Sequence, residues 1–271
     1  MTPRPLPLGV RGLAWLGALL LWAPLVAVAA FSFNRARYGV AWEGFTLDWY
    51  RLLLQNRPVL VATLNTLLLA LASTAISTLL GTLLALALQR FPWPPRLLRA
   101  LDAMVDLPVV TPDVVIAAAL VIAFHLFRAA TGLLEPGMAT MIIAHASFQL
   151  SFVALVVRGR LQLIGTTLPE AAHDLYATRR QLFLRVTLPL LFPGVLAGAL
   201  LAFTLSLDDF VISFFTSGRT NTLPIYIYSA ARRGLSPEVH ALSTLVVLGT
   251  ALLVLGLERA GRLLHGKDGS P

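Results

Sequence analysis

Six apolar runs, each long enough to cross a lipid bilayer, limit what this 271-residue chain can fold into. The hydrocarbon core of a bilayer is about 30 Å thick, so a spanning helix needs about 20 apolar residues. Backbone polar groups find no water at that depth, and a helix satisfies them within one segment. We therefore predict an all-α, polytopic membrane protein with a single transmembrane domain over residues 1–271. Its six spans are expected at residues 10–33, 58–88, 101–127, 137–157, 190–216 and 239–258.

The composition agrees with this fold class and excludes several functions. Apolar residues make up 57% of the chain and charged residues only 13%, unlike a soluble domain. Cysteine is absent, which excludes disulfides and thiolate metal sites, and the five histidines show no metal-ligand spacing. The net charge of +8 comes from basic residues scattered between the apolar runs, which indicates loop anchors rather than nucleic-acid binding.

The first apolar run has two features of a secretory signal peptide. Arg4 and Arg11 precede it, and the small residues AVAA at 27–30 lie near its end. Its apolar core is longer than the roughly 7 to 15 residues of a signal peptide, and further spans follow. We expect an uncleaved first helix.

The distribution of basic residues predicts the orientation. With the N-terminus in the cytoplasm, thirteen of the 21 Lys and Arg residues lie in inside segments and eight in outside segments. Cytoplasmic loops carry an excess of Lys and Arg, so both termini are expected in the cytoplasm.

On this topology residues 158–189 form the longest cytoplasmic loop. Two capping-box spacings, which begin at Thr167 and Thr178, predict two short helices there. The second helix is amphipathic and is suited to the membrane surface or the bundle. The first presents a low surface of small side chains edged by acids, which suits close approach by another protein. These side chains are Glu170, Ala171, Ala172 and Asp174.

The sequence Glu170-Ala171-Ala172, followed by Leu188-Pro189, resembles the EAA loop of permease subunits in bacterial binding-protein-dependent ABC importers. In that family the loop is a coupling helix that inserts into a groove of the cytoplasmic ATPase subunit. The resemblance therefore implies an ATPase-coupling site in this chain. Its residues are Glu170, Ala171, Ala172, Asp174, Leu175 and Tyr176.

Tyr176 departs from the family pattern, which has Gly at this position. Glycine permits a turn with positive φ, so a tyrosine implies either a different turn or a strained residue.

Further segments resemble the second permease subunit of spermidine/putrescine importers: residues 38–50, 111–117, 205–215 and 223–242. The resemblance implies the MetI-like fold of type I importer permeases, in the bacterial inner membrane, with a polyamine as cargo. It also implies three kinds of partner: two cytoplasmic ATP-binding subunits, a second homologous permease and a periplasmic substrate-binding protein. The chain has no G-x-x-x-x-G-K-[ST] loop, so ATP is expected to bind a partner and this subunit is not expected to be an enzyme or to hold a cofactor.

Four acids in the predicted spans are candidates for the substrate pathway, because a charge at membrane depth needs a partner, water or a purpose. They are Asp106, Asp113, Asp208 and Asp209. Pro108 and Pro112 interrupt the span around Asp113 and predict a broken helix of the kind that lines transport sites.

Plainer interpretations stay open for these acids. Thr111 is a candidate cap for the second half-helix, with Asp113 complementing its dipole. Asp208 and Asp209, about 100° apart on a helix, do not both point into one cavity, and Asp208 is expected near the outer boundary.

Two other functions also stay open. One is an importer of the same architecture for an anion or a metal complex. The other is an ion-coupled secondary transporter, in which the acids form the ion relay.

Overall fold

The computed structural model describes residues 8–36, 41–165, 167–232 and 237–265. The chain forms two compact units: Met1–Leu60 with Ile227–Pro271, and Val61–Tyr226. Apart from an isolated antiparallel bridge between Asn34 and Phe45, the described residues form helices, turns and loops. The helices are α1 (Leu8–Phe31), α2 (Asp48–Gln55), α3 (Arg57–Arg90), α4 (Pro95–Val110), α5 (Asp113–Thr131), α6 (Met138–Ile164), α7 (Thr167–Asp174), α8 (Arg179–Gln181), the π-helical segment η1 (Leu182–Thr187), α9 (Leu188–Asp208), α10 (Val211–Thr216), α11 (Leu223–Arg232) and α12 (Pro237–His265).

Five helical stretches in the described part of the chain are long and apolar enough to cross a membrane: Gly9–Phe31, Arg57–Arg90, Asp113–Thr131, Met138–Ile164 and Arg179–Asp208. A sixth apolar stretch, Pro237–Leu252 in α12, is shorter. The all-α membrane fold predicted from the sequence is confirmed.

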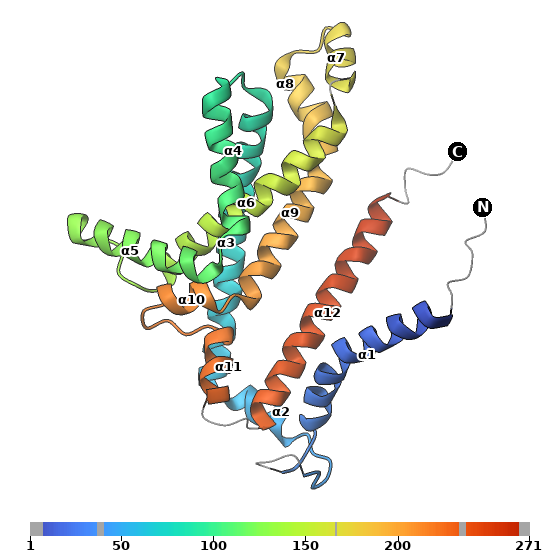
Figure 1. Ribbon diagram of the computed structural model, residues 1–271, viewed down its shortest axis with the longest axis vertical. Helices are drawn as coiled ribbons and strands as arrows, with labels where there is room; N and C mark the ends of the chain where they lie inside the picture. Colours follow the sequence, from blue (N-terminus) through green and yellow to red (C-terminus); the bar gives the residue numbers. More distant parts are fainter. Residues whose placement is uncertain (1–7, 37–40, 166, 233–236, 266–271) are drawn as a thin grey trace. The chain divides into compact units, whose positions relative to one another are not determined.

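Of the two prolines predicted to interrupt this span, Pro112 does so between α4 and α5 (Figure 1), whereas Pro108 lies inside α4 and does not break it. Thr111 takes an extended ψ of 135° because the ring of the following proline disfavours the helical conformation. The expected role of Thr111 as a cap of α5 is wrong: its hydroxyl donates to the Leu107 carbonyl at 2.7 Å, in the preceding turn. Asp113 lies in the first turn of α5, as expected.

The second short helix expected in the cytoplasmic loop is not separate. It begins with the predicted capping box at Thr178, and it then continues through η1 into α9. In η1 the Leu188 N–H donates five residues back, to the Phe183 carbonyl. Pro189 follows at once and has no N–H to donate. We interpret the wide turn as the local adjustment that lets the helix pass this proline unbroken.

In the unit Val61–Tyr226, α6 packs against α9 and α4. Close approach depends on glycines, because a Cβ at Gly81 of α3 would lie 2.8 Å from the Val153 Cβ of α6. Gly194 and Gly198 stand one turn apart on α9 and are both buried. Such a small-x-x-x-small pattern lets two helix backbones approach closely within a membrane.

In the other unit, α12 packs against α1 and α2, and the loop between α1 and α2 folds around Asn34. The Asn34 side chain donates to the Ala41 carbonyl at 2.7 Å and accepts from the Glu43 N–H at 3.0 Å. The Trp49 indole donates to the Asn34 carbonyl at 2.8 Å, so this buried tryptophan stabilises the loop.

Candidate functional site

The predicted ATPase-coupling residues lie on α7 and in the turn that follows it, beyond the ends of α6 and α8 (Figure 1). Glu170, Ala171 and Asp174 are exposed, and Ala172 is half-buried. Leu175 and Tyr176 are 82% and 95% exposed, so almost all of their apolar area is uncovered within this chain. The segment thus presents small, acidic and apolar side chains together on an uncovered tip.

Tyr176 takes a left-handed conformation with a φ of +58°. The Ala177 N–H donates to the Ala172 carbonyl at 3.0 Å, the bond that closes a Schellman motif at the end of a helix. Glycine is the usual residue at this position because a side chain there costs roughly 1–2 kcal/mol. Of the two possibilities raised by the sequence, a strained residue is confirmed.

Asp106 on α4 and Asp113 on α5 are both exposed. Neither carboxylate forms an ion pair or a side-chain hydrogen bond with the residues that the structure describes. The neighbouring Asp102 behaves differently, since it pairs with Arg158 and joins α4 to α6. Asp102 was not among the acids predicted from the sequence, in which its only signal is its position one turn before Asp106.

Asp208 and Asp209 do not share a helix, so the expected 100° separation does not apply. The last residue of α9 is Asp208, and Asp209 is extended with ψ of 115° before α10 begins at Val211. Asp208 is exposed, whereas the Asp209 side chain is only 9% exposed. The two neighbouring acids therefore occupy different environments.

Asp209 is held by hydrogen-bond donors from two helices. Its Oδ1 accepts the Ile212 N–H at 3.3 Å and its Oδ2 accepts the Ser213 N–H at 2.9 Å, both at the start of α10. His145 of α6 places Nε2 3.2 Å from Oδ2. A carboxylate that takes several donors in this way is stabilised in its charged form despite burial.

The His145 ring continues this network into α9 and α3. Its Nδ1 lies 2.8 Å from the Ser206 Oγ, and its Nε2 lies 3.0 Å from the Ser213 Oγ. The Ser206 hydroxyl in turn lies 3.2 Å from the Ser73 Oγ. We call these five residues the His145 network: Ser73, His145, Ser206, Asp209 and Ser213.

The His145 network contains a serine, a histidine and an aspartate within hydrogen-bond distance, the residue types of a hydrolytic triad. Ser206 and His145 are each only 1% exposed, so a substrate has no access to the hydroxyl or the ring. The arrangement joins helices and does not provide a nucleophile. Sequence reasoning missed His145 because its partners are 61 and more positions away.

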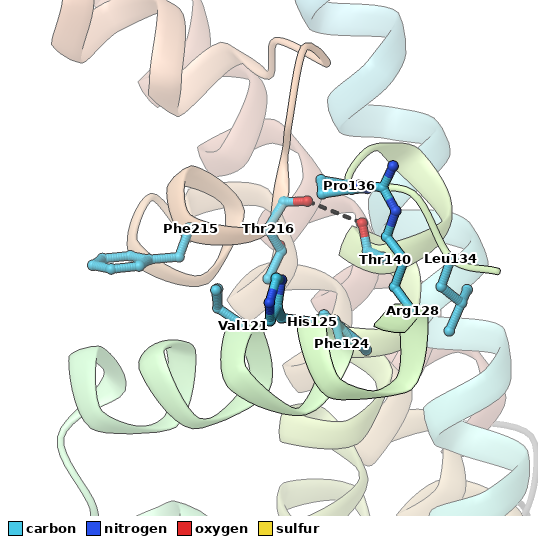
Figure 2. A pocket seen from close by; sticks show the side chains of 9 residues that line it. All are labelled: Val121, Phe124, His125, Arg128, Leu134, Pro136, Thr140, Phe215 and Thr216. Atoms are coloured by element: carbon cyan, nitrogen blue, oxygen red, sulfur yellow. Dashed lines mark hydrogen bonds between the residues drawn. The ribbon is translucent and has the colours of Figure 1, made fainter. Parts of the chain in front are cut away.

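A small cavity of about 110 Å³ lies between α5, α6 and α10. Figure 2 shows His125 and Arg128 of α5 at its wall, and the Thr140 hydroxyl donating to the Thr216 carbonyl at 3.0 Å. Arg128 pairs with Glu135 at 2.8 Å. None of the four candidate acids lines this cavity, and its cationic residue does not suit a positively charged cargo.

Comparison with known proteins identifies the family. Residues 77–267 match the family described as "Binding-protein-dependent transport system inner membrane component". The chain belongs to this family. It is therefore a multi-pass membrane permease of an inner-membrane transport system, as the EAA resemblance implied.

The chain is similar in sequence to curated relatives over most of their length. The chain is 35% identical over 243 residues to the spermidine/putrescine transport system permease protein PotC of Escherichia coli, covering 89% of each chain. It is 37% identical over 234 residues to the putrescine transport system permease protein PotI of E. coli, covering 86% of this chain and 83% of that one. It is also 34% identical to the molybdenum transport system permease protein ModB of Mycobacterium bovis, covering 94% and 95%.

Solved structures share the fold. A bacterial ABC transporter that imports the acidic polysaccharide alginate superposes with a TM-score of 0.74 at 20% identity, covering 94% of both chains. The methionine ABC transporter MetNI superposes with a TM-score of 0.60 at 21% identity, covering 81% of this chain and 97% of that one. These likenesses confirm the predicted fold of ABC importer permeases.

Proposed function

We propose that this chain forms half of the translocation pathway of an ATP-driven importer whose cargo is a polyamine. The observation that carries the proposal is 35–37% identity to polyamine permeases over nearly nine-tenths of the chain. The partners of such a subunit are two cytoplasmic ATP-binding subunits, a second related permease and a periplasmic substrate-binding protein. The termini and the α7 tip lie in the cytoplasm, in accord with the excess of basic residues in those segments.

The α7 tip, which consists of α7 and the turn after it, is the part of the permease that the ATPase binds. Its small side chains permit close approach, Glu170 and Asp174 offer charges, and the exposed Leu175 and Tyr176 supply apolar area for a partner to cover. ATP binding closes the two ATP-binding subunits and moves α7 with them. This movement opens the translocation pathway toward the outside of the membrane. The ATPase selects between two existing conformations because its affinity for them differs.

Acidic side chains attract the cargo along the pathway. A polyamine carries several ammonium groups on a flexible apolar chain, so its recognition requires spaced carboxylates. Asp106, Asp113 and Asp208 are exposed, which leaves them available to a cationic cargo. Asp209, the fourth acid predicted for the pathway, is nearly buried and is already held by His145 and by two N–H groups of α10. Changing Asp113 to Asn is expected to impair uptake without loss of assembly.

The similarity to a molybdenum permease favours a second candidate, an importer of an oxyanion. The two cargoes have opposite charges, so acids exposed in a shared pathway favour the polyamine. An ion-coupled secondary transporter is disfavoured by the family assignment, since the matching family is binding-protein-dependent.

Transport in proteoliposomes tests the proposal. The chain is purified with its companion subunits and reconstituted into vesicles with the ATPase subunits on the lumenal side. Uptake of radiolabelled spermidine and putrescine is then measured with and without ATP in the lumen. Uptake that requires ATP and is blocked by unlabelled polyamine but not by molybdate supports the proposal. Uptake of labelled molybdate without uptake of labelled polyamine assigns the oxyanion, and uptake driven by an ion gradient without ATP contradicts both.

A further inference from the structure

We propose that the two neighbouring acids at the α9–α10 junction have different duties. Asp208 contacts the cargo, whereas Asp209 is a positioning residue that, together with His145, holds the junction in place. The inference rests on the proposed function, because contact with cargo presupposes that α9 borders the pathway. It assigns a role to His145, which no cargo reaches.

The environment of Asp209 is that of a structural anchor. Its carboxylate accepts the Ile212 and Ser213 N–H groups and lies 3.2 Å from the His145 Nε2, and its side chain is 9% exposed. These three donors occupy most of the roughly four acceptor sites of the carboxylate, and an exposure of 9% leaves an ammonium group little access unless a donor is displaced. Leaving buried polar groups unpaired is costly, so cargo contact by Asp209 is disfavoured. Asp208, in contrast, is exposed and is not part of the His145 network.

The hydrogen-bond directions in the His145 network form one consistent chain. An ionised Asp209 accepts a hydrogen bond from the Nε2–H group of His145, which Ser213 Oγ shares at 3.0 Å. The Nδ1 atom of the neutral ring then accepts from the Ser206 hydroxyl at 2.8 Å. Ser206 then accepts from the Ser73 hydroxyl at 3.2 Å. This tautomer, assigned from the network, joins His145 to Asp209 and Ser206 without a second charge in the bundle.

The network fixes the backbone next to Asp208, the last residue of α9. Asp209 is extended and starts α10 through its bonds to two N–H groups, and His145 ties that turn to α6. Without His145, Asp209 would remain bound to α10, and Thr140 would still join α10 to α6, but the turn at Asp209 would lose its own side-chain hydrogen bond to α6. The direction of Asp208 would then no longer be fixed. His145 therefore sets the affinity for cargo through Asp208.

Two substitutions at one position separate this role from simple packing. The Gln side chain carries its amide nitrogen near the position of Nε2, so His145→Gln keeps the donor to Asp209. The shorter Asn side chain carries its amide at the level of Nδ1, so His145→Asn keeps only the Ser206 contact. In the reconstituted importer, Asp208→Asn is expected to raise the KM for polyamine about tenfold or more, the effect of losing a charge-assisted contact.

His145→Asn is expected to raise the KM by a similar factor, and to add little in an Asp208→Asn background. His145→Gln is expected to keep the KM within about twofold, since its donor remains. A packing role predicts a different pattern: both substitutions lower the Tm and the yield of the complex equally and leave the KM unchanged. That pattern overturns the inference, and so does a fully multiplicative effect in the double variant.

A second measurement requires no cargo. The assembled complex in detergent is treated with a water-soluble carbodiimide and an amine, and labelled carboxylates are located by mass spectrometry. We expect labelling at Asp208 and protection at Asp209, with Asp209 becoming reactive in His145→Asn but not in His145→Gln. Equal labelling of both acids, or protection of both, refutes the division of duties even if polyamine uptake is intact. Absent uptake with the expected labelling instead refutes the proposed cargo alone.

Discussion

Replacing Tyr176 with glycine is expected to stabilise the turn after α7. The tyrosine holds a φ of +58°, which costs roughly 1–2 kcal/mol for a residue with a side chain and nothing for glycine. About 0.4–1 kcal/mol of this gain is lost, because glycine raises the conformational entropy of the opened chain. Because the tyrosine side chain is 95% exposed, its removal sacrifices almost no burial within this chain. The net gain is about 0.5–1 kcal/mol.

Hydrogen exchange of the two amides that close the turn measures this gain. The Leu175 and Ala177 N–H groups donate to Ala171 and Ala172, so they exchange when the turn opens. A gain of 0.5–1 kcal/mol corresponds to exchange about two- to fivefold slower in Tyr176→Gly, after correction for intrinsic rates. Tyr176→Ala is the matched control, since it removes the aromatic ring but keeps the strain.

Equal protection in the Gly and Ala variants would refute the strain argument. Faster exchange in Tyr176→Gly than in the unsubstituted chain would show that the ring itself stabilises the turn. The same pair of variants also separates two effects on the ATPase: a loss of binding shared by both variants reports the missing ring, and a loss confined to Tyr176→Gly reports the changed backbone.

Three further outcomes are expected. Glu170→Lys should abolish ATP-driven uptake and weaken copurification of the ATPase while membrane insertion stays normal; unaltered uptake would remove the coupling role of α7. Gly81→Ala should lower the stability of the solubilised chain by about 1–3 kcal/mol, because its Cβ meets α6 at 2.8 Å, whereas Gly12→Ala, with no atom within 4 Å, should leave the Tm nearly unchanged. The chain has no cysteine, so single cysteines report topology directly: Ala177→Cys should react with an impermeant thiol reagent only from the cytoplasmic side, and Arg219→Cys only from the outside.

Local features of the sequence predicted local structure well. The break before Asp113 follows from Pro112 alone, and the strain at Tyr176 follows from a side chain at a position that favours glycine. The capping box at Thr178 is likewise contained in four residues. In each case the cause and its effect lie within one helical turn, so the sequence carries the information without knowledge of the fold.

Features that depend on several helices were not predictable in this way. Pro189 was expected to stand near the start of a separate span, but a π-helical turn lets the helix from Arg179 continue past it. The contact of Gly81 with Val153 joins residues more than 70 positions apart and depends on which faces of α3 and α6 meet. Apolar periodicity is a poor guide to those faces here, because lipid and protein neighbours both favour apolar side chains.

Asp209 shows where physical reasoning from the sequence succeeds and where it stops. An acid at membrane depth was expected to need a partner, water or a purpose, and the structure buries the Asp209 side chain among fixed partners. The purpose that we propose differs from the first expectation, because the cost of burying a charge is met equally well by cargo or by fixed donors. The sequence alone has no means of choosing between them, since the deciding partner, His145, lies on another helix. An acid in a transporter span therefore becomes a candidate for cargo contact only after its neighbours on the other helices are known, and Asp208 meets this condition better than Asp209.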